Sequence, residues 1–250
     1  MTDVPSFPEL LSLVDDRSAA LREAVAAAPD LEAPVPGCPD WSMRDLVEHI
    51  GHVQCFWAAV VTAGGDEPPP RETVGFTVPG DDLGGWLAAQ TRLLLAALGE
   101  AGPDAACWTW WGASDAPQNA GAVARHQVEE AAVHAYDAQE TIGKPEPIPA
   151  GVAVDGVAEF LQVTYGAEGA WPHRPARVVF AANEGPSWVL DLTPDGATID
   201  PAASGEPVAT VHGAASDILL ALFGRVPLER LRIDGDATVV EQLKGWGDTE

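Results

Sequence analysis

The amino-acid sequence predicts an α+β protein in which an N-terminal four-helix bundle precedes a smaller α+β domain. In the N-terminal part, apolar side chains recur at spacings of three and four residues, which is the period of amphipathic helices. From Arg177 onward, short runs of alternating apolar and polar residues are separated by turn sequences, which is typical of strands in hairpins. A proline-rich connector, residues 144–149, separates the two patterns. The predicted domains are therefore residues 1–145 and 150–250.

Four helices are predicted in the first domain. The first begins at Pro8 and ends before Pro29, and the second begins at Ser42, whose side chain suits an N-cap position. Glycine and proline residues stop the second and third helices. The predicted helices span residues 8–28, 42–63, 81–98 and 119–141. Helices of this length with connections of unequal size favour a four-helix bundle.

The second domain combines helices with short strands. A helix is predicted over residues 152–165, and turn sequences around Gly185 and Gly196 then divide the following segment into hairpins. The predicted strands span residues 177–180, 187–191, 197–199 and 207–211. A helix over residues 214–222, a short strand from Leu231 and a closing helix to Leu243 complete an α+β domain.

The charge of the chain limits its partners. The 250 residues include 13 Lys and Arg against 38 Asp and Glu, which gives a formal net charge of -25. A surface this negative repels phosphate backbones and anionic lipids, so we expect no nucleic-acid and no membrane partner. We expect a small-molecule substrate and a monomer or homodimer.

The sequence also predicts where the protein is located. It shows no apolar run long enough to span a membrane and no signal peptide, and its three cysteines lack a C-x-x-C pair. We therefore expect a cytoplasmic protein with reduced thiols.

Two residues of the predicted fourth helix suggest half of a metal site. Glu130 and His134 are four residues apart, so they project from one helical face on adjacent turns. A solvated side-chain pair is the alternative reading of this spacing. On the second helix, His49 lies about 60° from the centre of the apolar face and His52 about 120° from it. His49 therefore borders the bundle interior, as a ligand or as a hydrogen-bonded boundary residue, whereas His52 is expected to face water.

The polar stripe that contains Glu130 and His134 also contains Asp137, and the opposite face of this helix is rich in alanine. Either face could point inward. If the polar stripe does, burying it without partners would cost several kcal/mol, and a bound cation is the natural compensation. His49, Glu130 and His134 would then form a three-ligand site with an open position, as catalytic zinc sites have. Asp137 could orient a ligand or contact substrate, or could simply be exposed to solvent.

Two motifs resemble those of a known family. Residues 35–51, which read VPGCPDWSMRDLVEHIG, resemble the opening signature of the mycothiol-dependent maleylpyruvate isomerase family within the DinB-like bundle superfamily. The segment from Glu130 to Asp137 is similar to the Glu-x-x-x-His-x-x-Asp motif of that family. The C-terminal part, with Leu222-Phe-Gly-Arg225, looks like the accessory, SCP2-like α+β domain of many members.

The resemblance implies that His49, Glu130 and His134 bind a metal, normally zinc, and that mycothiol is a cosubstrate.

The sequence departs from the pattern of this family in two respects. Asp40 stands where many members have Gly, and basic residues are scarce near the expected site, although a dicarboxylate substrate would need several of them. Arg225 and His126 are therefore predicted to contact an anionic substrate, and Trp110 to line the ligand cavity. The alternative for Arg225 is a surface arginine paired with a carboxylate, and the alternative for Trp110 is a side chain that only packs in the core or at a domain interface. Cys38 is expected to hold a turn.

The leading hypothesis is a zinc-dependent enzyme that uses mycothiol to isomerise an electrophilic small molecule or that transfers the intact thiol to it as an S-conjugate. Zinc lowers the pKa of a bound thiol and can polarise a carbonyl group. Addition of the thiol to an activated alkene gives a thioether; bond rotation and loss of the thiol would give isomerisation, and retention would give transfer. The alternatives are a thiol-independent, metal-dependent hydrolase, lyase or rearrangement enzyme of specialised metabolism and a non-catalytic ligand-binding protein on the same scaffold.

Overall fold

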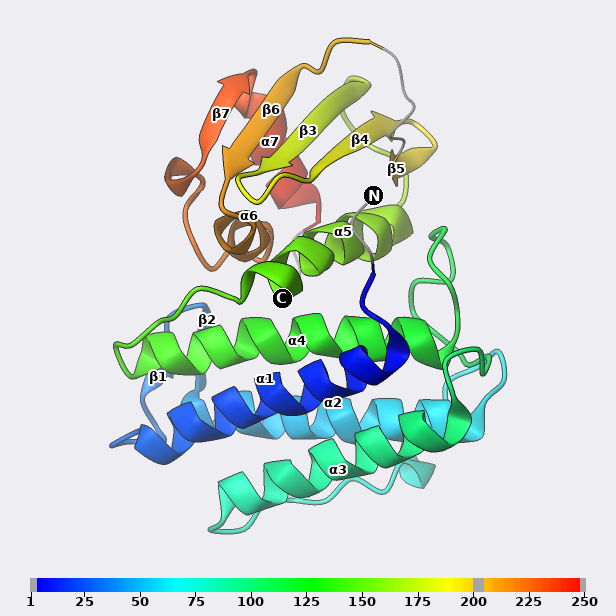
Figure 1. The fold of residues 1–250 in the computed structure, drawn as a ribbon, viewed down its shortest axis with the longest axis vertical. Helices are drawn as coiled ribbons and strands as arrows, with labels where there is room; N and C mark the ends of the chain where they lie inside the picture. The colour runs from blue at the N-terminus through cyan, green and yellow to red at the C-terminus, as the bar shows by residue number, and fades with distance from the viewer. Residues whose placement is uncertain (1–3, 200–204, 248–250) are drawn as a thin grey trace. The chain divides into compact units, whose positions relative to one another are not determined.

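The computed structural model describes residues 4–199 and 205–247. The chain forms two compact units. The bundle unit comprises Pro5–Trp110 and Pro117–Ile148, and the sheet unit comprises Met1–Val4, Trp111–Ala116 and Pro149–Glu250. The first unit is helical and the second contains a β-sheet (Figure 1), which confirms the predicted α+β class.

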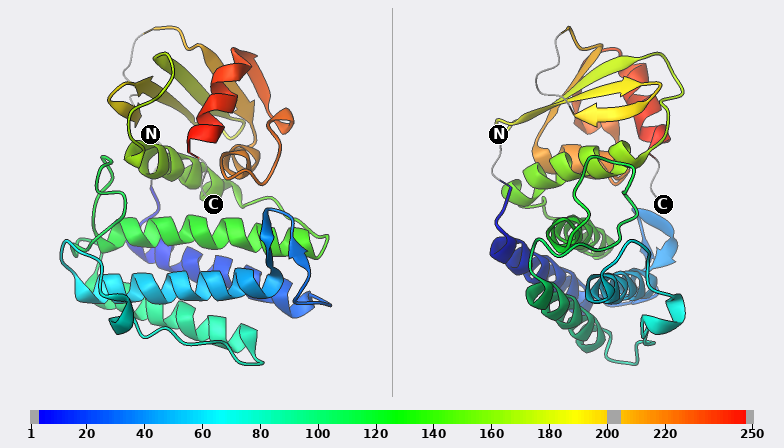
Figure 2. Two further views of the ribbon diagram at one scale, coloured as in Figure 1. Left: turned by 180° about the vertical axis from the view of Figure 1, so that it is seen from behind. Right: turned by 90° about the vertical axis from the view of Figure 1, so that its right-hand side faces the viewer.

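The bundle unit is built from four helices, of which Figure 2 shows α2 and α4 nearly end-on in its right-hand view. Helix α1 packs against α4 and α3, and α2 packs against α3 and α4. Side-chain caps mark where helices begin: Ser42 and Asp45 form a capping box at α2, and the Asn119 side chain accepts a hydrogen bond from the Ala122 amide at α4. The helices are α1 Phe7–Ala27, α2 Met43–Ala63, α3 Leu83–Ala101 and α4 Ala120–Thr141, with a short 3-10 helix, η1 Arg71–Thr73.

The predicted apolar face of α2 is largely confirmed, because Leu46, Ile50, Trp57 and Val60 are all buried in the bundle. Val53, which was expected on the same face, is only half-buried. Gln54 also occupies a buried position on this helix. Its amide donates to Ser18 Oγ on α1 at 2.9 Å and its Oε1 accepts from Thr91 Oγ1 on α3 at 2.9 Å. These bonds satisfy the polar groups and tie three helices together in one register.

A β-hairpin precedes α2, where the sequence suggests only a turn. It consists of β1 Pro34–Val35 and β2 Cys38–Ser42, paired antiparallel. Prolines at positions 34, 36 and 39 disfavour a strand in sequence-based reasoning, since proline cannot donate a ladder hydrogen bond. The turn expected at Cys38 is therefore wrong, because Cys38 is the first residue of β2.

The sheet unit contains a five-stranded sheet with the strand order β5-β4-β3-β6-β7. All neighbouring pairs are antiparallel except β3 and β6, which run parallel. None of the helices in the described residues is long and apolar enough to cross a membrane. The elements are α5 Ala150–Ala167, β3 Ala176–Ala182, β4 Ser187–Thr193, β5 Gly196–Ile199, β6 Ala209–Gly213, α6 Ala215–Leu222, η2 Leu228–Arg230, β7 Arg232–Gly235 and α7 Ala237–Trp246.

Candidate metal centre

Helices α2 and α4 bring three of the predicted site residues together. One potential ligand atom from each of His49, Glu130 and His134 lies within 4.8 Å of the others. The imidazole rings of His49 and His134 have centroids 5.2 Å apart, and Glu130 Oε2 lies 3.4 Å from His134 Nε2. The side chains that the sequence predicts as ligands therefore converge, although Glu130 and His134 lie 81 and 85 residues after His49 in the chain.

Asp137 supports His134 from the opposite side of the imidazole ring. Its Oδ2 lies 2.8 Å from His134 Nδ1, and its side chain is completely buried. The solvent-exposed alternative for Asp137 is therefore wrong. A carboxylate in this position accepts the Nδ1 proton, so Nε2, which faces Glu130, is the ring nitrogen that would bind a cation once its own proton is displaced.

The electrostatics of the metal-free cluster favour a positive charge between these groups. Burial alone would lower the pKa of His134, but its hydrogen bonds to Asp137 and Glu130 raise that pKa to about 9. Burial would raise the pKa of Glu130, but the hydrogen bond from His134 and the charges of His134, His126 and His49 lower that pKa to about 2. Without a metal, the positive charge between these groups comes from a proton on His134. A divalent ion would displace that proton, and two imidazoles and one carboxylate are a suitable ligand set for such an ion.

Strand β2 contributes two side chains beside the cluster that the sequence did not single out for the site. The Trp41 ring lies over His49, with centroids 4.5 Å apart and planes inclined at 42°. Its centroid is 6.1 Å from that of His134. The Cys38 thiol lies 3.9 Å from Asp137 Oδ2. Both residues fall within the signature of residues 35–51, which is the only sequence signal that could have found them.

His126 and Trp110 lie on the other side of Glu130, where they were predicted to bind substrate. His126 Nε2 is 3.7 Å from Glu130 Oε1. The Trp110 ring packs edge-on against His126 at 5.8 Å between centroids, and 43% of Trp110 is exposed. The neighbouring Trp108 instead stacks on Trp57. Trp110 is therefore the tryptophan of this loop, within the bundle unit, whose ring is open to solvent near the cluster.

The remaining histidine of α2 does not join the cluster. His52 Nε2 lies 3.1 Å from the Thr77 carbonyl oxygen, and its ring packs edge-on against Phe76 and Trp86. It is partly buried by these aromatic side chains rather than directed into water as expected. His52 therefore offers a control position on the same helix as His49.

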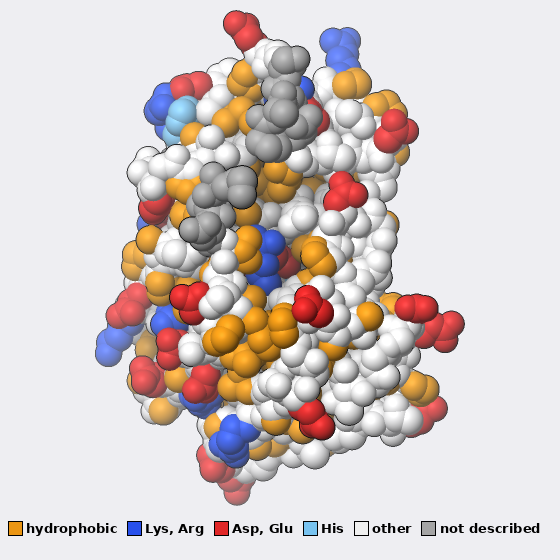
Figure 3. Space-filling view, turned by 45° about the vertical axis from the view of Figure 1, so that its right-hand side comes forward, with side chains coloured by type: hydrophobic (Ala, Val, Ile, Leu, Met, Phe, Trp, Pro, Cys, Tyr) orange, Lys and Arg blue, Asp and Glu red, His pale blue; other side chains and the backbone are white. Residues whose placement is uncertain are grey.

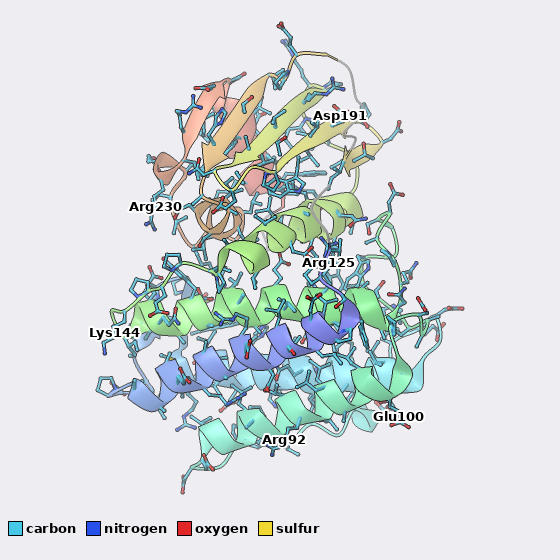
Figure 4. The ribbon with its side chains drawn as sticks, viewed as in Figure 1. Arg92, Glu100, Arg125, Lys144, Asp191 and Arg230 are labelled. Carbon is cyan, nitrogen blue, oxygen red and sulfur yellow. The ribbon has the colours of Figure 1, made fainter. Side chains whose placement is uncertain are left out.

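Three arginines, Arg44, Arg125 and Arg225, bear on whether the site can hold an anionic substrate. Arg44 pairs with Glu32 at 3.3 Å near the start of α2. Figure 4 shows Arg125 on α4 and Lys144 in the connector after it. Arg225 belongs to the sheet unit, where its Nη1 donates to the Phe223 carbonyl oxygen at 2.8 Å, and its predicted contact with substrate stays a prediction. Acidic side chains are spread over the face drawn in Figure 3.

Comparison with known proteins places these observations in a family. The family model described as the mycothiol maleylpyruvate isomerase N-terminal domain matches residues 11–139, and the model of the MDMPI C-terminal domain matches residues 151–242. Two solved structures have the same fold, a mycothiol-dependent maleylpyruvate isomerase at 18% identity and its histidine-to-alanine mutant at 17%. Each has a TM-score of 0.60, with 93% of this chain and 94% of the other covered. A search of curated protein sequences gives no significant match.

Proposed function

Because the chain belongs to the mycothiol-dependent maleylpyruvate isomerase family, we propose that it is a zinc-dependent enzyme that uses mycothiol to isomerise an electrophilic small molecule or to form an S-conjugate with it. The observation that carries this proposal is the cluster of His49, Glu130 and His134, whose potential ligand atoms lie within 4.8 Å of one another. Two nitrogen donors and one carboxylate are a ligand set of catalytic zinc sites, which keep a fourth position open.

In this proposal His49, Glu130 and His134 hold the ion. Zinc in such a site supplies Lewis acidity, which lowers the pKa of a thiol bound to it and polarises a carbonyl group. Asp137 accepts the proton of His134 Nδ1 and fixes the tautomer that presents Nε2. Burial of Asp137 keeps water from competing for this hydrogen bond, so the ring orientation is held before any ligand arrives.

The substrate side of the proposed site is formed by His126 and Trp110. Trp110 offers a half-exposed ring for the apolar part of a substrate, and His126 offers a cationic or neutral hydrogen-bond donor. His126 Nε2 is 3.7 Å from Glu130 Oε1, so in this proposal it donates a hydrogen bond to a substrate group held beside Glu130 at the open position of the metal.

Charge narrows the substrate class. Arg44 is engaged by Glu32, and the chain carries a net charge of -25, so its field disfavours a substrate with several negative charges. We therefore propose that the substrate is an electrophile with at most one carboxylate group and not a dicarboxylate. The negative charge of the chain is equally compatible with the second candidate function, a thiol-independent hydrolase, lyase or rearrangement enzyme acting on a weakly charged metabolite.

The experiment is a turnover assay of zinc-loaded protein with and without mycothiol. Maleylpyruvate and a panel of monocarboxylate and neutral activated alkenes serve as substrates, and products are identified by mass spectrometry. Mycothiol-dependent formation of an isomer supports the isomerase, and an accumulating S-conjugate supports the transferase. Turnover that needs zinc but proceeds without thiol supports the second candidate. Binding of the panel without turnover under any condition would leave a non-catalytic ligand-binding protein and contradict the proposal.

A further inference from the structure

We propose that strand β2 positions both histidines of the metal cluster, through Trp41 packed on His49 and through Cys38 bonded to Asp137. Neither residue is placed among the metal ligands; each acts on a ligand from outside. The inference rests on the proposed function insofar as it takes His49, Glu130 and His134 to be metal ligands. It adds a role for the segment that precedes α2, which is otherwise only a connection between α1 and α2.

The irregular pairing of β2 explains how two of its side chains reach the same region. Val35 pairs with Cys38 and Pro34 pairs with Ser42, so one step along β1 is matched by four along β2. In a regular strand, residues three apart point to opposite faces. The register shift breaks that alternation, and both Cys38 and Trp41 pack against the buried core of the bundle while Pro39 and Asp40 stay exposed. Bulges commonly redirect side chains toward functional sites.

Trp41 acts on His49 through ring packing. The rotation of an imidazole about its outer side-chain torsion is only weakly restricted by its own chain, so neighbours decide where the nitrogen points. Trp41 lies over His49 at a centroid distance of 4.5 Å and reaches His134 at 6.1 Å. An indole on one face of His49 limits that rotation and excludes water from the same face.

Cys38 acts on His134 through Asp137. Its thiol lies 3.9 Å from Asp137 Oδ2, the oxygen that also lies 2.8 Å from His134 Nδ1. The carboxylate is therefore held from two sides, by the thiol of a strand and by the imidazole of its own helix. These two residues are 99 positions apart, so the contact ties the hairpin to α4. A buried carboxylate with two donors has less freedom to turn away from the histidine.

Cys38, His134 and Asp137 also form a compact set of potential metal donors. An ion held by all three would have to replace the 2.8 Å hydrogen bond between Asp137 and His134 Nδ1. That bond is of charge-assisted type and completely buried, which favours a supporting role for Asp137 over a ligand role. Metal stoichiometry separates the two roles.

The test measures zinc affinity of purified full-length variants by competition with a chromophoric chelator, and the visible spectrum of the cobalt(II)-loaded protein. Cys38→Ala is expected to weaken zinc binding by about tenfold and to alter the cobalt spectrum, because Asp137, which orients His134, loses its contact with the thiol. Cys38→Ser keeps a hydroxyl donor and is expected to restore most of the affinity. Trp41→Leu is expected to show a similar loss, and Trp41→Phe to retain most of the binding because an aromatic face remains.

The matched control is Cys55→Ala on α2. Cys55 is buried and its thiol contacts the Val74 carbonyl oxygen, so its loss perturbs the bundle away from the cluster. It is expected to leave zinc affinity unchanged. Wild-type affinity and spectrum in both Cys38→Ala and Trp41→Leu would overturn the proposal, as would two zinc ions in the wild type that fall to one in Cys38→Ala. Full zinc binding by His49→Ala would instead overturn the proposed metal site itself.

Discussion

Asp137 follows His134 by about one turn of α4, and its Oδ2 lies 2.8 Å from His134 Nδ1. The carboxylate is completely buried. This pair links the buried interior of the bundle to the proposed metal site. The carboxylate orients the ring and increases its basicity, and the opposite nitrogen faces Glu130. Together with the hydrogen bond to Glu130, the pair raises the pKa of His134.

Replacing the carboxylate is expected to weaken metal binding without removing it. Asp137→Asn keeps the shape of the side chain but loses its charge, and its amide can present the wrong group to His134 Nδ1. We expect zinc affinity to fall by about 10- to 100-fold, which is the range for losing a group that hydrogen-bonds the second ring nitrogen of a histidine ligand. Competition with a chromophoric chelator measures the change. Affinity equal to that of the wild type would mean that Asp137 does not support a ligand.

Zinc uptake by the metal-free protein is expected to release protons near neutral pH. The pKa of His134 is raised to about 9, so its Nε2 carries a proton at pH 7 that the metal must displace. Apparent zinc affinity should therefore rise by about tenfold per pH unit from pH 7 and level off above about pH 9. Calorimetry in buffers of different ionisation enthalpy counts the protons. Release of none at pH 7 would contradict the raised pKa.

The stability of the metal-free protein is expected to depend on the same group. The pKa of His134 is about 9 in the folded state, above its ordinary value of 6.5. The folded protein then holds a proton that the unfolded chain has lost, so this contribution is complete below pH 6.5 and disappears as pH rises to about 9. Metal-free protein should show a melting temperature that falls over this range. In His134→Gln, which cannot be protonated, this part of the decline should be absent.

The polar network in the bundle core should be costly to break. Gln54→Leu removes one hydrogen-bond partner each from Ser18 Oγ and Thr91 Oγ1, and Ser18 and Thr91 are buried. We expect the free energy of unfolding to fall by about 2–3 kcal/mol, because buried hydroxyls lose a hydrogen bond. Urea denaturation measures it. Glu100→Ala, at an exposed position near the end of α3 (Figure 4), is the control and should change stability by less than about 0.5 kcal/mol.

Local sequence patterns predicted much of the bundle. Ser42 announces the start of α2, and its capping box with Asp45 is present. The spacing of Glu130 and His134 places both on one face of α4, and the apolar face of α2 puts His49 beside the interior. These features depend on helical periodicity within short segments, which a sequence displays directly.

Contacts between distant segments could not be predicted in the same way. The contact of Cys38 with Asp137 depends on the irregular register of a hairpin whose prolines argue against a strand. The orientation of α4 was also open, because an alanine-rich face and a polar stripe are both compatible with burial. In the structure both are buried: Ala131 and Ala135 on one side, and His134 and Asp137 on the other. Tertiary packing decided what periodicity left undetermined.

The measurement that tests the central claim most directly is the zinc content of purified protein and its variants, determined by elemental analysis together with native mass spectrometry. The proposal that His49, Glu130 and His134 bind the metal predicts one zinc ion per chain in the wild type and in His52→Ala. It predicts a zinc content near zero in His49→Ala and His134→Ala. Stoichiometric zinc in either of the latter two folded variants would contradict the proposed site.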